Sequence, residues 1–176
     1  MATFLLAYSS VDGQTRRIMN VLAEELVRAD HQIRYVDIES GELPLWQGID
    51  QVVVGAAVRY GDHRPALYRF VERHQGELAK RPSAFFSVNL TARKPNRNTP
   101  DNSRYMQKFR EKSPWRPDRL AVFPGALQWD RYGLFDKTMI RFIMWLTKGP
   151  TDTGKDVDFT DWQQVRDFAR TLAGQA

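Results

Sequence analysis

Hydrophobic and polar positions follow two different periods along this chain, one typical of strands and one typical of helices. Residues 4–8 form a continuous apolar run, as in a parallel strand that is covered on both faces. From residue 15 to residue 29 the apolar positions take the spacing of an amphipathic helix. The alternating run 32–38 predicts an edge strand, and the apolar run 51–58 predicts a central one.

The second half of the chain continues this alternation. The pattern predicts helices over 65–74 and 102–111, strands over 83–90 and 120–127, and a last helix that begins at Thr160 with Gln163 as its capping-box partner. Residues 157–159 are expected to resume the fifth strand after an insertion. The whole pattern predicts one domain over 1–176 with a doubly wound five-stranded parallel sheet in the order 2-1-3-4-5, its fifth strand interrupted by an insertion.

The loop after the first strand has the composition of an anion site. Its sequence is Tyr8-Ser9-Ser10-Val11-Asp12-Gly13-Gln14-Thr15. Free backbone N–H groups at a helix N-terminus favour an anion, and Ser10 and Thr15 add hydroxyl donors. No lysine follows Gly13, which excludes the nucleoside-triphosphate loop, and the missing glycines exclude the dinucleotide fingerprint. Two interpretations stay open: a phosphate loop, or a turn capped by Ser and Thr.

The third strand ends in small residues. Residues 55–57 are Gly-Ala-Ala, which leaves room at the edge of the sheet where ligands bind in open α/β folds. Arg59, Tyr60 and Gly61 follow, a planar cation and an aromatic ring that suit a planar ligand or, alternatively, a solvated turn. The histidines share no metal-ligand spacing, and His63 is the one that lies close enough to test as a proton acceptor.

Composition narrows the class of protein. The 176 residues have 42% hydrophobic content, which excludes intrinsic disorder, and no uncharged apolar stretch long enough to span a bilayer. No secretory signal is expected at the N-terminus. The chain lacks cysteine, which excludes disulfides and thiolate metal sites. Its net charge of +5 favours an anionic partner.

Two later segments concentrate positive charge. Arg93, Lys94 and Arg97 follow the fourth strand and either point at an anionic ligand or form a solvated face. Residues 134–148 read as a helix with a basic stripe and a broad apolar surface rich in aromatic side chains. A cation at position 141 excludes a bilayer span, so this helix either lies in a membrane interface or is buried against the sheet or in a homodimer.

Several strings together resemble the bacterial flavodoxin-like protoporphyrinogen oxidases, the quinone-dependent protoporphyrinogen IX dehydrogenases. They are the loop 8–15, Gly-Ala-Ala-Val-Arg-Tyr-Gly at 55–61, the stretch 83–95, Trp-Arg-Pro-Asp-Arg at 115–119 and Thr-Asp-Trp at 160–162. Generic flavodoxins share only the first of these. The one departure from the flavodoxin loop is Asp12, where Thr is usual, and its carboxylate is expected to point away from the phosphate.

The resemblance implies a flavodoxin-like fold with flavin mononucleotide (FMN) as cofactor, and no metal. The implied cofactor residues are Ser10, Val11, Asp12, Gly13, Gln14, Thr15, Val58, Arg59, Tyr60, Gly61, Asn89 and Leu90. The implied substrate residues, which would meet the two propionates of a porphyrinogen, are Arg59, Arg93, Lys94 and Arg97. No catalytic residue is assigned, because the flavin carries the chemistry.

The resemblance further implies oxidation of protoporphyrinogen IX to protoporphyrin IX, with menaquinone or ubiquinone as acceptor, in haem biosynthesis. The enzyme would work peripherally on an anionic membrane surface, at the cytoplasmic side of the inner membrane. Three other classes remain: a flavodoxin-type electron carrier, a nicotinamide-dependent quinone reductase and a nucleic-acid-binding module. Electron-carrier flavodoxins are typically acidic, which counts against the first, and no nucleic-acid motif is present, so no nucleic-acid partner is expected.

Overall fold

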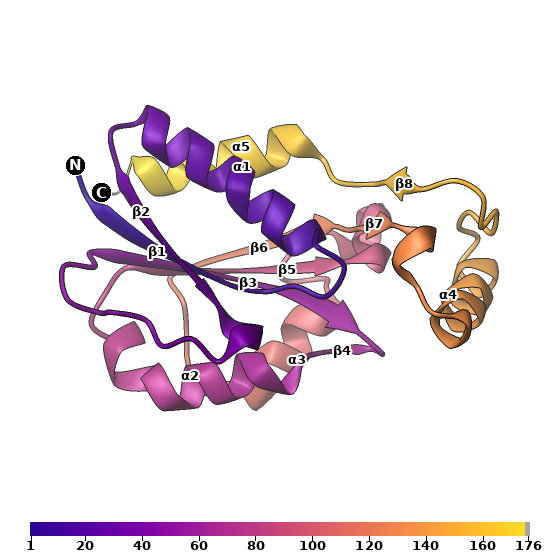
Figure 1. Cartoon of the computed structure of the whole chain (residues 1–176), viewed down its shortest axis with the longest axis horizontal. Helices are drawn as coiled ribbons and strands as arrows, with labels where there is room; N and C mark the ends of the chain where they lie inside the picture. Colours follow the sequence, from indigo (N-terminus) through magenta and orange to yellow (C-terminus); the bar gives the residue numbers. More distant parts are fainter. Residues whose placement is uncertain (175–176) are drawn as a thin grey trace.

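A central parallel sheet organises the molecule, with helices on both of its faces (Figure 1). The computed structural model describes residues 1–174. The five parallel strands are, in spatial order, β2 (Gln32–Asp37), β1 (Thr3–Ser9), β3 (Gln51–Arg59), β5 (Ser83–Asn89) and β6 (Arg119–Pro124). A two-residue strand, β4 (Asp62–His63), pairs antiparallel with β3. Numbered in chain order, the parallel strands run 2-1-3-4-5, which confirms the predicted topology.

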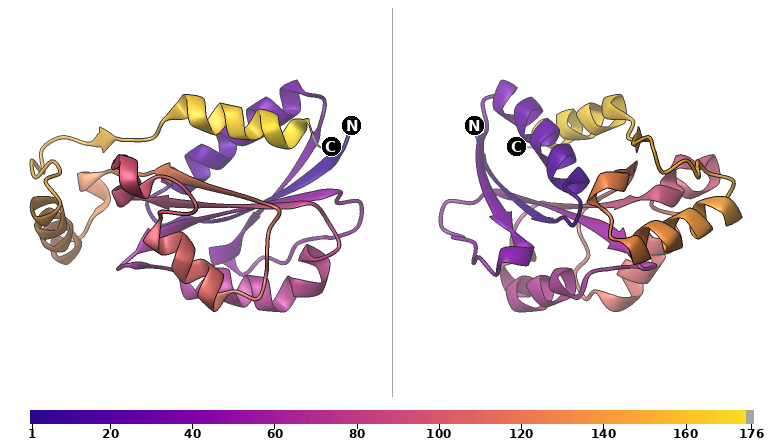
Figure 2. Two further views of the ribbon diagram at one scale, coloured as in Figure 1. Left: turned by 180° about the vertical axis from the view of Figure 1, so that it is seen from behind. Right: turned by 45° about the vertical axis from the view of Figure 1, so that its right-hand side comes forward.

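Two pairs of helices cover the sheet. Helices α1 (Gln14–Arg28) and α5 (Trp162–Ala173) lie on one face, and α2 (Pro65–Leu78) and α3 (Arg104–Lys112) lie on the other (Figures 1 and 2). Helix α2 continues beyond the predicted end at residue 74, across a non-helical φ of −112° at His74. The added turn brings Leu78 into the core. Short 3-10 turns complete the layers: η1 (Ile38–Ser40), η2 (Leu90–Arg93) and η3 (Pro95–Arg97).

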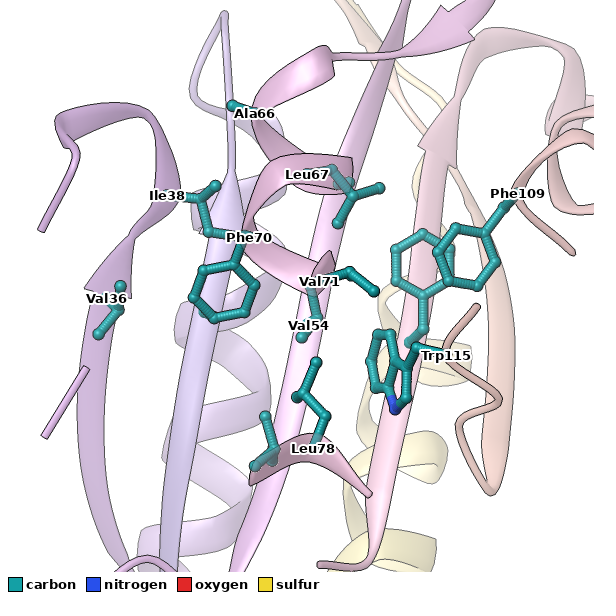
Figure 3. Close-up of a cluster of buried hydrophobic side chains, with 14 of the residues drawn as sticks. Val36, Ile38, Val54, Ala66, Leu67, Phe70, Val71, Leu78, Phe109 and Trp115 are labelled. Carbon is teal, nitrogen blue, oxygen red and sulfur yellow. The ribbon is translucent and has the colours of Figure 1, made fainter. Parts of the chain in front are cut away.

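Alternate side chains of each strand enter two separate cores. On the α2 and α3 side, Phe85 stacks on Phe109 with ring centroids 4.0 Å apart, and Trp115 meets both rings edge-on (Figure 3). On the α1 and α5 side, Phe86 packs against Phe123. Both faces of the central strands are therefore apolar, which explains why their sequences read as continuous hydrophobic runs rather than alternating ones.

The cap of α5 differs from the prediction. The Asp161 carboxylate accepts hydrogen bonds from the backbone N–H groups of Gln163 and Gln164, so Asp161 is the N-cap and Thr160 is not. The Thr160 hydroxyl instead donates to the backbone oxygen of Pro124 and accepts from Gln14 Nε2. It joins the end of β6 to the start of α1.

An insertion leaves the sheet after β6 and carries a helix that stands apart from both layers (Figure 2). It contains β7 (Ala126–Leu127), η4 (Trp129–Arg131), α4 (Leu134–Leu146) and β8 (Val157–Asp158). Strands β7 and β8 pair antiparallel in a separate ribbon, so the expectation that residues 157–159 resume the fifth strand is wrong.

Helix α4 begins at residue 134 as predicted but ends at Leu146 rather than at residue 148. The alternative that this helix is buried against the sheet is wrong. Met144 is its single fully buried side chain, within a small cluster with Leu127, Trp129 and Tyr132. These partners belong to the insertion itself, so the insertion has its own core. Within residues 1–174, no helix has the length and hydropathy that crossing a membrane requires.

Gly55 tests the fit between β3 and β5. A Cβ atom at this position would lie 2.2 Å from Cζ of Phe86, its partner on β5. We expect Gly55→Ala to lower the free energy of unfolding, measured with urea, by about 1–3 kcal/mol, because the ring must leave its packed position. Gly76→Ala, at an exposed helical glycine with open space around it, is the control and should stabilise by roughly 0.5–1 kcal/mol. Equal effects of the two substitutions would contradict this account of the core.

Candidate functional site

A cleft of about 440 Å³ opens at the carboxyl ends of the parallel strands. Its floor comes from the residues that follow β1, β3 and β5, and α4 of the insertion closes one side. The volume suits a cofactor-sized ligand, and the position is the switch point of a doubly wound sheet. Of the predicted cofactor residues, those that line the cleft are Ser10, Val11, Asp12, Gln14, Thr15, Val58, Arg59, Tyr60, Gly61, Asn89 and Leu90.

The loop between β1 and α1 has the features of an anion-binding loop rather than of a capped turn. Gly13 has a φ of +91°, a conformation that side-chain-bearing residues rarely adopt, and it precedes α1 with no side-chain cap. The hydroxyls of Ser10 and Thr15 are buried without a hydrogen-bond partner. Buried polar atoms normally have partners, so these two donors, together with the free N–H groups of the helix start, fit a phosphate.

The other predicted members of this loop have structural roles as well. Gln14 Nε2 donates to Asp158 Oδ1 at 3.0 Å and to the Thr160 hydroxyl at 2.7 Å. The backbone N–H of Gln14 belongs to the first turn of α1, where N–H groups lack intrahelical acceptors. Arg131 was not predicted: its guanidinium donates to the backbone oxygen of Asp12 and lies 2.7 Å from the point where a Cβ of Gly13 would be. A cation therefore stands next to the predicted phosphate loop.

Asp12 and Arg59 form part of an ion-pair bridge across the cleft. Arg59 Nη1 donates to Asp12 Oδ2 at 2.6 Å, and Arg59 Nη2 donates to Asp136 Oδ2 on α4 at 2.7 Å. The Tyr60 hydroxyl donates to the other oxygen of Asp136 at 2.5 Å. The Asp12 carboxylate thus turns toward Arg59, and the bridge joins the phosphate loop, the turn after β3 and the first turn of α4.

The bridge stabilises the charged forms of Arg59 and Asp136. Burial opposes the charge of Arg59, but Asp12 and Asp136 outweigh it and raise its pKa. The hydrogen bond from Tyr60 and then the charge of Arg59 lower the pKa of Asp136 below its ordinary value. Since two carboxylates already occupy the Arg59 guanidinium, the structure does not support Arg59 as a free partner for a propionate.

The remaining predicted substrate residues do not line the cleft. Arg93 Nη1 donates to the backbone oxygen of Leu90 at 2.8 Å, and Arg93 Nη2 donates to the Thr147 hydroxyl at 2.8 Å. Arg93 therefore holds the end of α4 and is engaged within the protein. Lys94 and Arg97 lie farther along the same turn, outside the cleft.

Asn89 supplies a third unpaired donor. Its side-chain oxygen accepts from the Thr91 hydroxyl and the Ala92 N–H, which orients the amide, while its Nδ2 is buried and has no partner. Asn89 and Leu90 line the same cleft as Val58 and Tyr60. Three orphaned donors around one cavity fit a ligand that carries several acceptors, such as a flavin phosphate and ring.

His63 does not reach the cleft. It is buried against Phe85 and Phe109, and its Nε2 lies 2.8 Å from the Ser87 hydroxyl. Burial lowers its pKa to about 4, so the ring is neutral near pH 7 and a weak base. The hypothesis that His63 is a proton acceptor for a ligand in the cleft is therefore wrong. Residues 1–174 contain no cluster of metal-ligating side chains.

Sequence reasoning missed the inner face of α4. Met139, Ile140, Ile143 and Met144 line the cleft together with Asp136. Their spacing of three to four residues places them on one face of the helix. A helix that packs this face against the sheet would show the same spacing, so the pattern does not distinguish the two arrangements. Asp136 could have distinguished a cleft wall from a helix packed on the sheet. A single carboxylate within an apolar stripe predicts a specific cationic partner.

Known proteins share both the fold and the sequence. A family profile described as "Flavodoxin domain" matches residues 5–154. The structure resembles oxidised flavodoxin 1 from Bacillus cereus with a TM-score of 0.57 over 99% of both chains, at 12% sequence identity. This likeness supports the fold alone. The flavodoxin domain implies a flavin cofactor, which agrees with the donors in the cleft.

Two curated relatives are much closer in sequence, and both are named protoporphyrinogen IX dehydrogenase [quinone]. The relative from Escherichia coli K12 is 47% identical over 169 residues, which cover 96% of this chain and 93% of that protein. The relative from Leishmania major is 43% identical over 174 residues, which cover 96% of this chain and 74% of that protein. The chain belongs to the family of quinone-dependent protoporphyrinogen IX dehydrogenases, flavodoxin-domain oxidoreductases, as its sequence motifs predict.

Proposed function

We propose that this protein oxidises protoporphyrinogen IX to protoporphyrin IX with FMN as cofactor and a membrane quinone as electron acceptor. The observation that carries the proposal is the cleft itself, because it combines unpaired phosphate-loop donors with an apolar wall contributed by α4. The sequence relatives, named for this substrate and acceptor class, support the same activity.

The chain's residues divide the work of holding the cofactor. The Ser10 and Thr15 hydroxyls and the N–H groups at the start of α1 bind the phosphate, with Arg131 beside them. The Val58–Gly61 turn and the Asn89 amide, which line the same cleft, would hold the flavin ring. When bound, the ring supplies the two-electron acceptor that dehydrogenation of a porphyrinogen requires.

Helix α4 prepares the cleft for a large apolar substrate. Its inner side chains, with Tyr105 and Tyr132, exclude water and offer surface for a tetrapyrrole. Arg59 and Arg93 position this wall through Asp136 and Thr147, so both guanidinium groups are engaged within the protein and neither is proposed to bind a propionate. Lys94 and Arg97 stay proposed partners for the propionates at the open rim after Leu90.

A flavodoxin-type electron carrier and a nicotinamide-dependent quinone reductase are the competing functions. An electron carrier exchanges electrons at the exposed edge of its flavin and needs no substrate wall, so α4 counts against it. A reductase fed by nicotinamide would use the same cleft for a different hydride donor. Direct assay of both donors separates the three classes.

Contact with a membrane follows from the proposed acceptor, because respiratory quinones are dissolved in lipid. The outward side of α4 is exposed and apolar: Leu134 is 87% exposed and Trp145 is 68% exposed. Since the inward side of the same helix lines the cleft, binding through α4 would bring the cleft to the membrane surface. We propose peripheral attachment at the cytoplasmic side of the inner membrane.

The cofactor proposal predicts a specific loss in one variant. Thr15→Val keeps the side-chain shape but removes an unpaired hydroxyl, so we expect the Kd of apoprotein for FMN to rise about tenfold or more, as for a lost hydrogen bond to a charged group. Flavin fluorescence quenching measures the Kd. Thr171→Val, on the exposed side of α5, is the control and should bind FMN like the parent. Unchanged binding in both would contradict the phosphate site.

The activity is tested by anaerobic mixing of the FMN-loaded protein with protoporphyrinogen IX and a quinone, with porphyrin fluorescence as readout. We expect porphyrin to form only when both are present. Quinone reduction by a nicotinamide, without porphyrin formation, would establish the reductase function instead. If neither protoporphyrinogen IX nor a nicotinamide reduces the flavin, the result would support the electron-carrier function.

The bridge at Asp136 predicts how α4 is held. Asp136→Asn removes the charge that attracts Arg59, so we expect faster amide hydrogen exchange in α4 and unchanged exchange in β1, β3 and β5. The lowered pKa gives the pH dependence: the carboxylate stabilises the anchored helix at pH values above its ordinary range, and this stabilisation is lost as pH falls through the lowered value. Protection of α4 that does not change with the variant or with acid would contradict the anchor.

A further inference from the structure

A second hollow, of about 310 Å³, lies on the side of α4 that faces away from the cleft. Its walls are Thr138, Arg141, Phe142 and Trp145 of the helix and Thr151 of the segment that follows it. No residue of the loop 8–15 or of the strand ends contributes to it. The hollow is therefore separate from the cofactor cleft and needs its own explanation.

The hollow has a basic side and an apolar side. At 100° per residue, Lys137 and Arg141 fall on one edge of the outer face of α4, and Leu134, Phe142 and Trp145 lie beside them. Among the described residues, no acidic side chain forms an ion pair with these two cations. The one acidic residue of α4, Asp136, points to Arg59 on the cleft side, so the outer face has only positive charge.

The aromatic side chains give the hollow an amphipathic shape. The rings of Phe142 and Trp145 lie 6.1 Å apart, tilted by 30°, and both are more than half exposed. Arg141 lines the hollow together with Thr138 and Thr151, and its planar guanidinium suits the oxygens of a phosphate. The Thr138 hydroxyl donates to the Leu134 carbonyl, so the donors available to a ligand are Arg141 and Thr151.

We propose that this hollow binds the phosphate of an anionic phospholipid, with the acyl chains along the exposed apolar stripe of α4. The inference rests on the membrane contact proposed above and names its lipid chemistry and its site. A free phosphate would account for Arg141 but not for the apolar residues that border it. A second copy of the chain is less suitable, because a symmetric pairing of these faces would bring the unpaired cations together. Charge and apolar area both match an anionic lipid surface.

The test is flotation of the FMN-loaded protein with vesicles of phosphatidylcholine alone and of phosphatidylcholine mixed with phosphatidylglycerol. We expect binding only to the mixed vesicles. Lys137→Gln, which removes a nearby charge outside the hollow, should weaken binding about fivefold, as for one diffuse surface cation. Arg141→Gln should weaken it about twentyfold or more, and Arg141→Lys should not restore it, because the planar guanidinium is lost.

Controls separate this site from its alternatives. Arg73→Gln, an equal charge change on the exposed side of α2, should bind like the parent, and unchanged flavin content shows that each variant is folded. Equal losses in Lys137→Gln and Arg141→Gln would overturn the site in favour of diffuse attraction. Displacement by inorganic phosphate, beyond that caused by chloride at equal ionic strength, would show a free-anion site and overturn the proposal. So would a dimer, seen by ultracentrifugation, that Arg141→Gln dissociates.

The assay contains neither porphyrinogen nor quinone, so its outcome does not depend on the proposed oxidation. A protein that binds the mixed vesicles through Arg141 but forms no porphyrin would retain the lipid site and lose the enzymatic proposal. A protein that forms porphyrin but floats with neither kind of vesicle would retain the enzymatic proposal and lose the lipid site.

Discussion

One guanidinium, that of Arg59, lies between two carboxylates that belong to different parts of the molecule. Asp12 belongs to the loop that precedes α1, and Asp136 belongs to the insertion helix α4. Because α4 buries little of its surface against the rest of the fold, its position depends on this bridge and on the Arg93 contact at its other end. Without them, the cleft would lose one wall and become an open groove at the edge of the sheet.

The bridge explains why one helix can have two apolar sides. Its inner side chains line the cofactor cleft, where Met144 also enters the small core of the insertion, and its outer side chains are exposed, so neither side is buried against the sheet. The polar contacts of Arg59 and Arg93 at the two ends hold the helix in place and leave both of its faces available for contacts with ligands. The phosphate loop departs from the flavodoxin pattern at Asp12, where Thr is usual. The bridge gives a physical reason for this difference, because the Asp12 carboxylate is the bridge's inner end.

The sheet could be predicted from sequence because each central strand is buried on both faces and each covering helix on one. The bridge could not: Asp136 is 77 residues from Arg59, and an arginine beside a crevice suits a ligand anion as well as an internal carboxylate. The N-cap of α5 could not be predicted either, because Thr160 and Asp161 both have side chains that can cap a helix. In the structure the Thr160 hydroxyl bonds to Pro124 and Gln14 instead. The loop 10–15 could be predicted as a candidate site because its glycine and hydroxyls are contiguous in sequence, and the structure places most of its residues along the cleft.

The central claim is that α4 forms one wall of the flavin cleft, and the methionines offer a direct test. The chain has five, of which Met139 and Met144 line the cleft, while Met19 and Met106 are buried in the two cores of the sheet. Methyl NMR of the apoprotein labelled at methionine should show ring-current shifts at Met139 and Met144 when FMN is added, with Met19 and Met106 nearly unchanged. Shifts confined to the core methionines, or saturating FMN binding without any shift on α4, would contradict the account.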